Sequence, residues 1–127
     1  MSATCWSLST SFEYAGMGDF RWQIANGPTP KDIAENPALK GVTIAATGRA
    51  TRAVVLATKT LLFAAEGWGG APLLRAHDKA TGEVLAEIKL PGAVGDVPMS
   101  YAIAGKQYIA LSVAGERGAE IVALSLP

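Results

Sequence analysis

VVLATKTLLFAAEGWGGAPLLRAHDKATGEVLAEIKL (residues 54–90) is the stretch of sequence that decides the fold. Short apolar runs alternate in it with turn-forming residues such as Gly67, Gly69, Gly70 and Gly82. Runs of this length between glycine-rich or polar turns are typical of antiparallel strands. The sequence therefore predicts four consecutive strands, at Val54–Thr58, Leu61–Glu66, Leu73–Asp78 and Val84–Leu90.

A weak internal repeat extends this pattern towards the C-terminus. LLFAAEG (61–67) is similar to YIALSVAG (108–115); Gly67 and Gly115 lie 48 positions apart, and Ala76 and Ala123 lie 47 apart. A period of about 40–50 residues is typical of four-stranded propeller blades, although two buried hairpins could also merely look alike. Three more strands are expected at Met99–Ala104, Gln107–Ala114 and Ile121–Leu126. We thus predict an all-β chain, a β-propeller fragment of about two to three four-stranded antiparallel blades with one short helix.

The N-terminal part has a different pattern, and residues 1–17 show no clean period. The run DFRWQI (19–24) is expected to form one strand with Phe20, Trp22 and Ile24 on one face. The short helix is predicted at Thr29–Asn36, with Thr29 as N-cap, Pro30 in the first helical position and Pro37 after its end.

Composition excludes several classes of protein. The 127 residues suffice for about one ordinary domain, and 50% of them are hydrophobic, too many for a disordered chain. Eleven basic residues balance eleven acidic ones, so no net field attracts nucleic acid or an anionic membrane. Cys5 and His77 are the only residues of their kinds, which excludes an intrachain disulfide and leaves a His/Cys metal site without ligands. No membrane-spanning run and no signal peptide is visible.

The sharpest local motif is AHDKATGE (76–83), between the third and fourth predicted strands. Asp and Thr side chains accept backbone hydrogen bonds in turns, and glycine adopts a positive φ without strain. We therefore expect Asp78 and Thr81 to form hydrogen bonds within the hairpin and Gly82 to have a positive φ. A simple hairpin turn would already explain these residue types.

In its spacing this motif resembles the tryptophan-docking motif AxDxxTGxxxW of pyrroloquinoline quinone (PQQ) dehydrogenases. In that family it joins the third and fourth strands of each blade, and its Trp docks against the next blade. Ala86 stands at the Trp position here, so this copy lacks the ring. GDFRW (18–22) resembles the end of an earlier copy with Trp22 in place, although Phe12, Tyr14 and Met17 replace its Ala, Asp and Thr.

The resemblance covers about residues 18–127, which are similar to the carboxyl-terminal blades of a quinoprotein glucose or alcohol dehydrogenase. It is carried by TGRATRAVVLATKTLLFAAEGWGG (47–70), PMSY (98–101) and GKQYIAL (105–111). It implies one partial propeller domain over 1–127. The expected parts are an atypical segment at 1–17, the end of one blade with a helical insert at 18–53, a complete blade at 54–90 and a partial last blade at 91–127.

The resemblance also implies a chemistry. Such enzymes hold PQQ and a calcium-type ion in a central funnel, oxidise an aldose sugar or an alcohol, and pass electrons to a quinone or cytochrome in the periplasm. Their catalytic Asp and quinone-binding Lys come from earlier blades, so we expect no catalytic or metal-binding residue here, no tight PQQ binding and no activity of the isolated chain. The expected partners are the remaining blades or further copies of the chain, because open blade faces and strand edges need a cover.

Four residues are candidates for contact with the cofactor. Arg49 and Arg52 precede the first strand of the complete blade, and in the family the inner strands line the funnel, where cations would meet the PQQ carboxylates. Glu66 and Trp68, in the EGWGG loop (66–70), are candidates at the funnel mouth, whereas His77 is expected at the surface. The alternative function is a non-catalytic propeller module for protein binding; such modules share the docking motif but not the 47–70 run.

Overall fold

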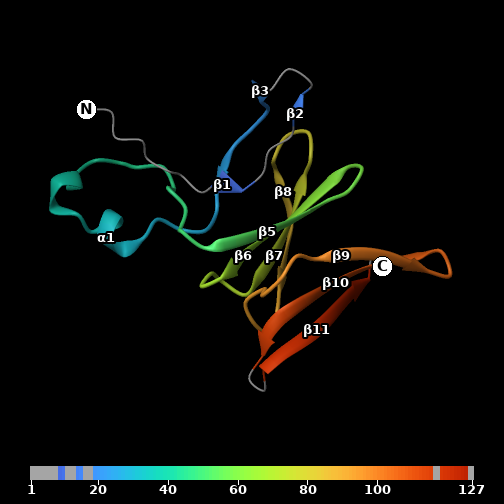
Figure 1. The fold of residues 1–127 in the computed structure, drawn as a ribbon. Helices are drawn as coiled ribbons and strands as arrows, with labels where there is room; N and C mark the ends of the chain where they lie inside the picture. The colour runs from blue at the N-terminus through green and yellow to red at the C-terminus, as the bar shows by residue number, and fades with distance from the viewer. Residues whose placement is uncertain (1–8, 11–13, 16–18, 116–117, 126–127) are drawn as a thin grey trace.

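The protein folds as two antiparallel sheets that lie side by side, preceded by an N-terminal segment with little regular structure (Figure 1). The computed structural model describes residues 9–10, 14–15, 19–115 and 118–125. Within these residues, strands make up most of the regular structure, which confirms the predicted all-β class.

The first sheet has four strands in chain order: β5 (Arg52–Ala57), β6 (Leu61–Trp68), β7 (Leu73–Asp78) and β8 (Val84–Lys89). Every neighbouring pair is antiparallel. The turns between them fall at the glycine-rich and polar stretches that the sequence indicates. The predicted four-stranded sheet between residues 54 and 90 is therefore confirmed, with strand ends that differ from the prediction by one or two residues.

The second sheet has three strands, β9 (Met99–Ile103), β10 (Lys106–Gly115) and β11 (Gly118–Ser125), in the order β11-β10-β9. The three predicted strands are confirmed, but β11 begins three residues earlier than expected. The predicted end at Leu126 lies outside the described residues. Val94 forms an isolated bridge with Val113, so the linker between the sheets already pairs with β10.

The hydrophobic core lies between the two sheets. Alternate residues of β6 and β7 point towards the second sheet, because successive side chains of a strand lie on opposite faces. They meet alternate residues of β10, with two residues of the linker between them. The buried core consists of Phe63, Ala65, Leu74, Ala76, Leu90, Val94, Ile109, Leu111 and Val113.

The predicted strand at residues 19–24 is wrong in its extent. The structure has two separate two-residue strands instead, β3 (Asp19–Phe20) and β4 (Ile24–Ala25). β3 pairs with β2 (Tyr14–Ala15), and β4 pairs with β1 (Ser9–Thr10). The strand breaks between them because Trp22 turns towards the four-stranded sheet; the Phe20 side chain lies outside the described part of the chain.

The predicted helix is shorter than expected. α1 covers Lys31–Ala34 with Pro30 as its N-cap, and a separate 3-10 turn follows at Pro37–Leu39. Thr29 does not cap the helix, because its hydroxyl accepts a hydrogen bond from the backbone N–H of Thr47 (3.2 Å). Neither helical turn in the described segments is long and apolar enough to cross a membrane.

Candidate functional site

The turn at Asp78–Gly82, called the docking turn below, is closed by the side chain of Asp78. Its Oδ1 accepts hydrogen bonds from the backbone N–H groups of Ala80 (2.8 Å) and Thr81 (2.9 Å) and from the Thr81 hydroxyl (3.2 Å). The Thr81 hydroxyl in turn accepts one from the backbone of Glu83 (3.3 Å). These bonds, first of all the one from the Thr81 backbone, lower the pKa of Asp78. Gly82 has φ +79°. Both predictions for this turn are confirmed.

Trp22 lies on the docking turn from outside the sheet. Its Nε1–H donates a hydrogen bond to the carbonyl oxygen of Lys79 (3.0 Å). A Cβ at position 82 would lie 2.6 Å from Cδ2 of the indole, so only glycine leaves room for the ring. A residue 57 positions earlier in the chain therefore packs on the turn, as the docking motif predicts for a Trp of the preceding copy.

His77 is not a surface residue, contrary to the prediction. It is only 2% exposed, and its ring stacks on Trp22 with 6.2 Å between the ring centroids. Its Nδ1 lies 3.0 Å from the carbonyl oxygen of Gly82. The prediction took His77 as part of an exposed turn, whereas it lies in β7, on the face that Trp22 covers.

Glu66 lies at the centre of a buried ion pair. It is 1% exposed, and its Oε1 accepts a hydrogen bond from Nη1 of Arg75 (3.0 Å) while Oε2 accepts one from the backbone N–H of Ala71 (2.9 Å). Nε of Arg75 binds Glu87 on the next strand (2.7 Å). Burial lowers the pKa of Arg75, but Glu87 and Glu66 together raise it above the ordinary value. Glu66 thus belongs to strand β6 and holds the sheet end together.

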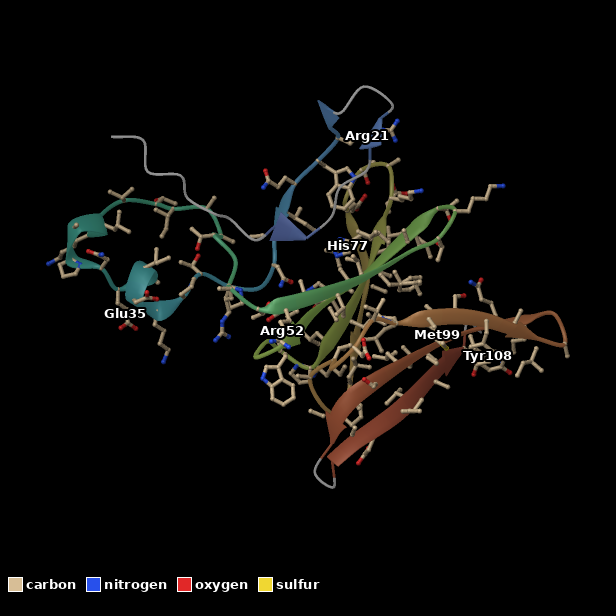
Figure 2. All side chains as sticks on the ribbon, viewed as in Figure 1. Arg21, Glu35, Arg52, His77, Met99 and Tyr108 are labelled. Carbon is tan, nitrogen blue, oxygen red and sulfur yellow. The ribbon has the colours of Figure 1, made fainter. Side chains whose placement is uncertain are left out.

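Two of the other three candidates, Arg52 and Trp68, lie at one end of the four-stranded sheet, and Arg49 lies three residues before Arg52 in the chain; the three are called the rim residues below. Arg52 begins β5 and is paired in register with Trp68 at the end of β6. Figure 2 shows Arg52 at this end of the sheet. Arg49 and Arg52 are exposed, and Trp68 is 64% exposed. No carboxylate of the described residues forms an ion pair with either arginine.

A single glycine shapes this rim. Gly67, between Glu66 and Trp68, has φ +75°, and a Cβ there would collide with the backbone carbonyl of Arg52. At the same place, the pairing of β5 with β6 is irregular between Arg52 and Val54. Such a bulge redirects the side chains that follow it. It accounts for a buried Glu66 and an exposed Trp68 only two positions apart.

The rim has the chemistry for part of a site. Two unpaired guanidinium groups suit carboxylates, and an exposed indole suits a flat conjugated ring. Trp68 also borders a cavity of about 330 Å³, whose opposite wall is formed by the ends of β10 and β11. Within the described residues, no three His, Cys, Asp or Glu side chains are grouped to hold a metal ion.

The sequence did not identify Arg75 as a residue of the site. It also did not predict that Trp22 stacks on His77. Arg75 could have been found, because a charged residue inside an apolar strand needs a partner, and Glu66 is the matching charge on the adjacent predicted strand. The stacking of Trp22 on His77 carries no comparable signal, since it depends on how a distant segment crosses the sheet.

Comparison with known protein families supports this reading of the fold. Residues 2–109 match the model of the family described as "PQQ: Glucose/ethanol/alcohol dehydrogenase, beta-propeller domain". The match includes most of the first seventeen residues, which the resemblance was expected to leave out. No curated protein and no solved structure gives a significant match to the chain. Because the family model covers well over half of the chain, the protein belongs to the glucose/ethanol/alcohol dehydrogenase β-propeller family.

Proposed function

We propose that this chain supplies two adjacent blades to a PQQ-dependent dehydrogenase that oxidises an aldose sugar or an alcohol. The observation that carries the proposal is the rim, where Arg52 and Trp68 are register partners and Arg49 lies three residues before Arg52. PQQ is a planar tricarboxylate, so a flat exposed indole beside one arginine, with a second three residues away in the chain, fits it chemically. PQQ supplies the two-electron chemistry when it is bound, with a calcium-type ion as the metal.

The roles of the four candidates differ. Arg49 and Arg52 would attract the carboxylates, and Trp68 would contact the ring system. Glu66 is better assigned to the structure, because both of its oxygens already accept hydrogen bonds and almost none of its surface is exposed. A carboxylate near the substrate hydroxyl, which such chemistry requires as a base, would come from another part of the propeller.

The second sheet indicates that further strands belong next to this chain. With an offset of 47 residues, Ala76 in β7 corresponds to Ala123 in β11. β7 pairs on both sides, with β6 and β8, whereas β11 pairs only with β10 among the described residues. β11 carries Glu120 as its single charge and contains no proline, so its free edge lacks the features that block strand pairing.

The region beside this edge is also apolar. A cavity of about 310 Å³ reaches the end of β11, and half of its lining residues are apolar: Leu61, Phe63, Ile88, Ile109 and Leu124. Large side chains on the far face of the second sheet are exposed as well, notably Met99, Ile103 and Ile121. We propose that the remaining blades cover these surfaces in the whole enzyme, and that the isolated chain covers them by self-association.

The electron acceptor and the location follow from the same proposal. A quinoprotein of this kind passes its electrons to a quinone or a cytochrome, and it works in the periplasm. The alternative is a non-catalytic propeller module that binds proteins, which the docking turn and the open β11 edge would serve equally well. The 47–70 run favours the enzyme, because the protein-binding modules share the docking motif but not this run.

Titration with PQQ distinguishes these two functions. We expect the full chain to bind PQQ weakly at low salt and to lose most of the binding by about 0.15 M salt, where exposed charges are screened beyond roughly 8 Å. Arg52→Gln should weaken binding several-fold, and Trp68→Ala should do so at every salt concentration. Lys31→Gln, an equal change of charge on the exposed helix α1, is the matched control. No binding at low salt, or equal losses in Arg52→Gln and Lys31→Gln, would contradict the proposal.

A further inference from the structure

A second cavity, called the N-terminal cavity below, lies on the other face of the four-stranded sheet. Its volume is about 380 Å³, and it is a partly open pocket between that sheet and the segment from β4 to the turn after it. Ile24 and Pro28 line it from the segment, and Ala64 and Val84 line it from the sheet. None of the rim residues contributes to it. Its size and mostly apolar lining are typical of sites for small molecules.

His77 is a buried polar side chain in the wall of the N-terminal cavity. It lines the cavity, and Figure 2 shows it on the side of the sheet that faces the N-terminal segment. Because the carbonyl oxygen of Gly82 can only accept, the proton that lies between them is assigned to Nδ1. Nε2 is then left with a lone pair, and none of the described residues donates to it. A buried acceptor without a donor is unfavourable, so a hydroxyl in the cavity would stabilise it.

The charges around the cavity exclude an anion as the preferred ligand. Arg75 also lines the cavity, but its guanidinium group is bound by both Glu66 and Glu87. Two carboxylates around one cation leave no positive charge to attract an acid. The remaining polar wall is Asn26, which is buried and donates its side-chain N–H to the Thr51 hydroxyl (2.8 Å). The cavity therefore suits an apolar, uncharged molecule that carries one hydroxyl group as a hydrogen-bond donor.

We propose that the N-terminal cavity binds a neutral cyclic alcohol of the phenol class, whose hydroxyl donates to Nε2 of His77. Its ring would lie among Ile24, Ala64 and Val84. A dry apolar cavity of about 150 Å³ already accommodates benzene, so there is room here for one or two rings. This site shares no residue with the rim, and its occupation involves no quinone chemistry.

The experiment uses two probes of nearly the same shape, 4-fluorophenol and 4-fluorotoluene. Binding of each to the full chain is measured by fluorine NMR. The tryptophan fluorescence, to which Trp22 contributes as one of three tryptophans and with its ring stacked on His77, gives a second readout. We expect the phenol to bind about 2- to 10-fold more tightly than the more apolar toluene, which corresponds to one net hydrogen bond. In His77→Phe, which keeps a ring against Trp22 but lacks Nε2, this preference should disappear.

A second pair of variants tests the position without changing His77. Val84→Trp places a large ring in the cavity and should abolish binding of both probes. Val97→Trp makes the same change in the linker that leads to the second sheet, at an exposed position (65% against 46%) that does not line the cavity, and should leave binding unchanged. This pair decides the question even if His77→Phe fails to fold.

Three results would overturn the proposal. The first is no binding of 4-fluorophenol at millimolar concentration, which would mean that the cavity holds only water. The second is equal affinity for both probes in the unaltered chain, which would leave an apolar cavity with no role for His77. The third is an equal loss of binding in Val84→Trp and Val97→Trp, which would place the probe elsewhere.

Discussion

The indole of Trp22 lies directly over Gly82, and its Nε1–H donates to the carbonyl of Lys79 in the same turn (3.0 Å). This contact joins the N-terminal segment to the four-stranded sheet across 57 positions of sequence. The turn is prepared for it, because the Asp78 carboxylate holds the backbone N–H groups of Ala80 and Thr81 and leaves the Lys79 carbonyl to the indole. The segment before β5 is therefore attached to the blade by a specific contact.

Loss of this contact should reduce stability. Trp22→Ala removes a partly buried ring and one hydrogen bond, and we expect it to lower the free energy of unfolding by about 2–4 kcal/mol. Trp68→Ala is the matched control, because this ring is 64% exposed, and its removal should cost about 0.5 kcal/mol or less. Urea denaturation of both variants measures the difference. Equal losses would show that Trp22 does not hold the segment to the sheet.

Substitutions of two glycines in one turn allow the effect of a steric clash to be measured apart from that of backbone strain. Gly67 and Gly69 have similar positive φ values, +75° and +84°, so alanine is strained by about 1–2 kcal/mol at either position. Only at Gly67 does the new Cβ also collide with the carbonyl of Arg52; nothing lies within 4 Å at Gly69. Gly67→Ala should thus lower the thermal midpoint clearly more than Gly69→Ala. A similar decrease in both would argue against the close β5–β6 approach.

Glu66, at the buried end of the ion-pair cluster, should contribute far more to the free energy of unfolding than Glu87 at the exposed end. Glu66→Ala leaves Arg75 with one partner and the Ala71 N–H with none, and we expect a loss of about 2–4 kcal/mol in the free energy of unfolding. Glu87 is 52% exposed, and Glu87→Ala should cost about 1 kcal/mol or less. Chemical denaturation at one pH compares the two. A larger effect of Glu87→Ala would contradict the assignment of Glu66 to the structure.

The docking turn should weaken in acid. The pKa of Asp78 is lowered from its ordinary value of 3.8, chiefly by the hydrogen bond from the Thr81 backbone. Its contribution to stability is therefore complete above pH 3.8 and is lost as the pH falls through the lower folded-state value. The difference in thermal midpoint between the unaltered chain and Asp78→Asn should shrink in that range. Asp32→Asn, in helix α1, is the control; an unchanged difference at low pH would show that the carboxylate is not what closes the turn.

The sheets could be predicted from the sequence because their signals are local. Strands of five to ten residues between glycine-rich turns follow from the pattern alone, and the AHDKATGE motif predicts both the Asp78 bonds and the φ of Gly82. The short helix was harder, since its start depends on Thr29 binding the backbone of Thr47, eighteen positions away. Helix propensities and capping rules consider only neighbouring residues, so they do not predict a hydrogen bond between Thr29 and Thr47.

The candidate site was predicted less completely, for a geometric reason. Which face a side chain takes near the end of β6 depends on the irregular pairing at Gly67, so Glu66 and Trp68 could not be told apart from the sequence. His77 was placed at the surface because the motif reads as an exposed turn, whereas its burial results from Trp22 crossing the sheet. Long-range contacts of this kind are set by topology rather than by local pattern.

The most direct test of the account compares dye-linked dehydrogenase turnover of this chain with that of the same chain joined to the protein encoded immediately upstream in its genome. Both are supplied with PQQ and Ca²⁺ and offered aldoses and primary alcohols. We predict no turnover above the no-protein control for the chain alone, and turnover of the joined protein that falls when Trp68 is changed to Ala. Turnover by the chain alone would contradict the claim that its catalytic groups come from other blades. An inactive joined protein that binds no PQQ would contradict the claim that these two sheets are blades of a quinoprotein dehydrogenase.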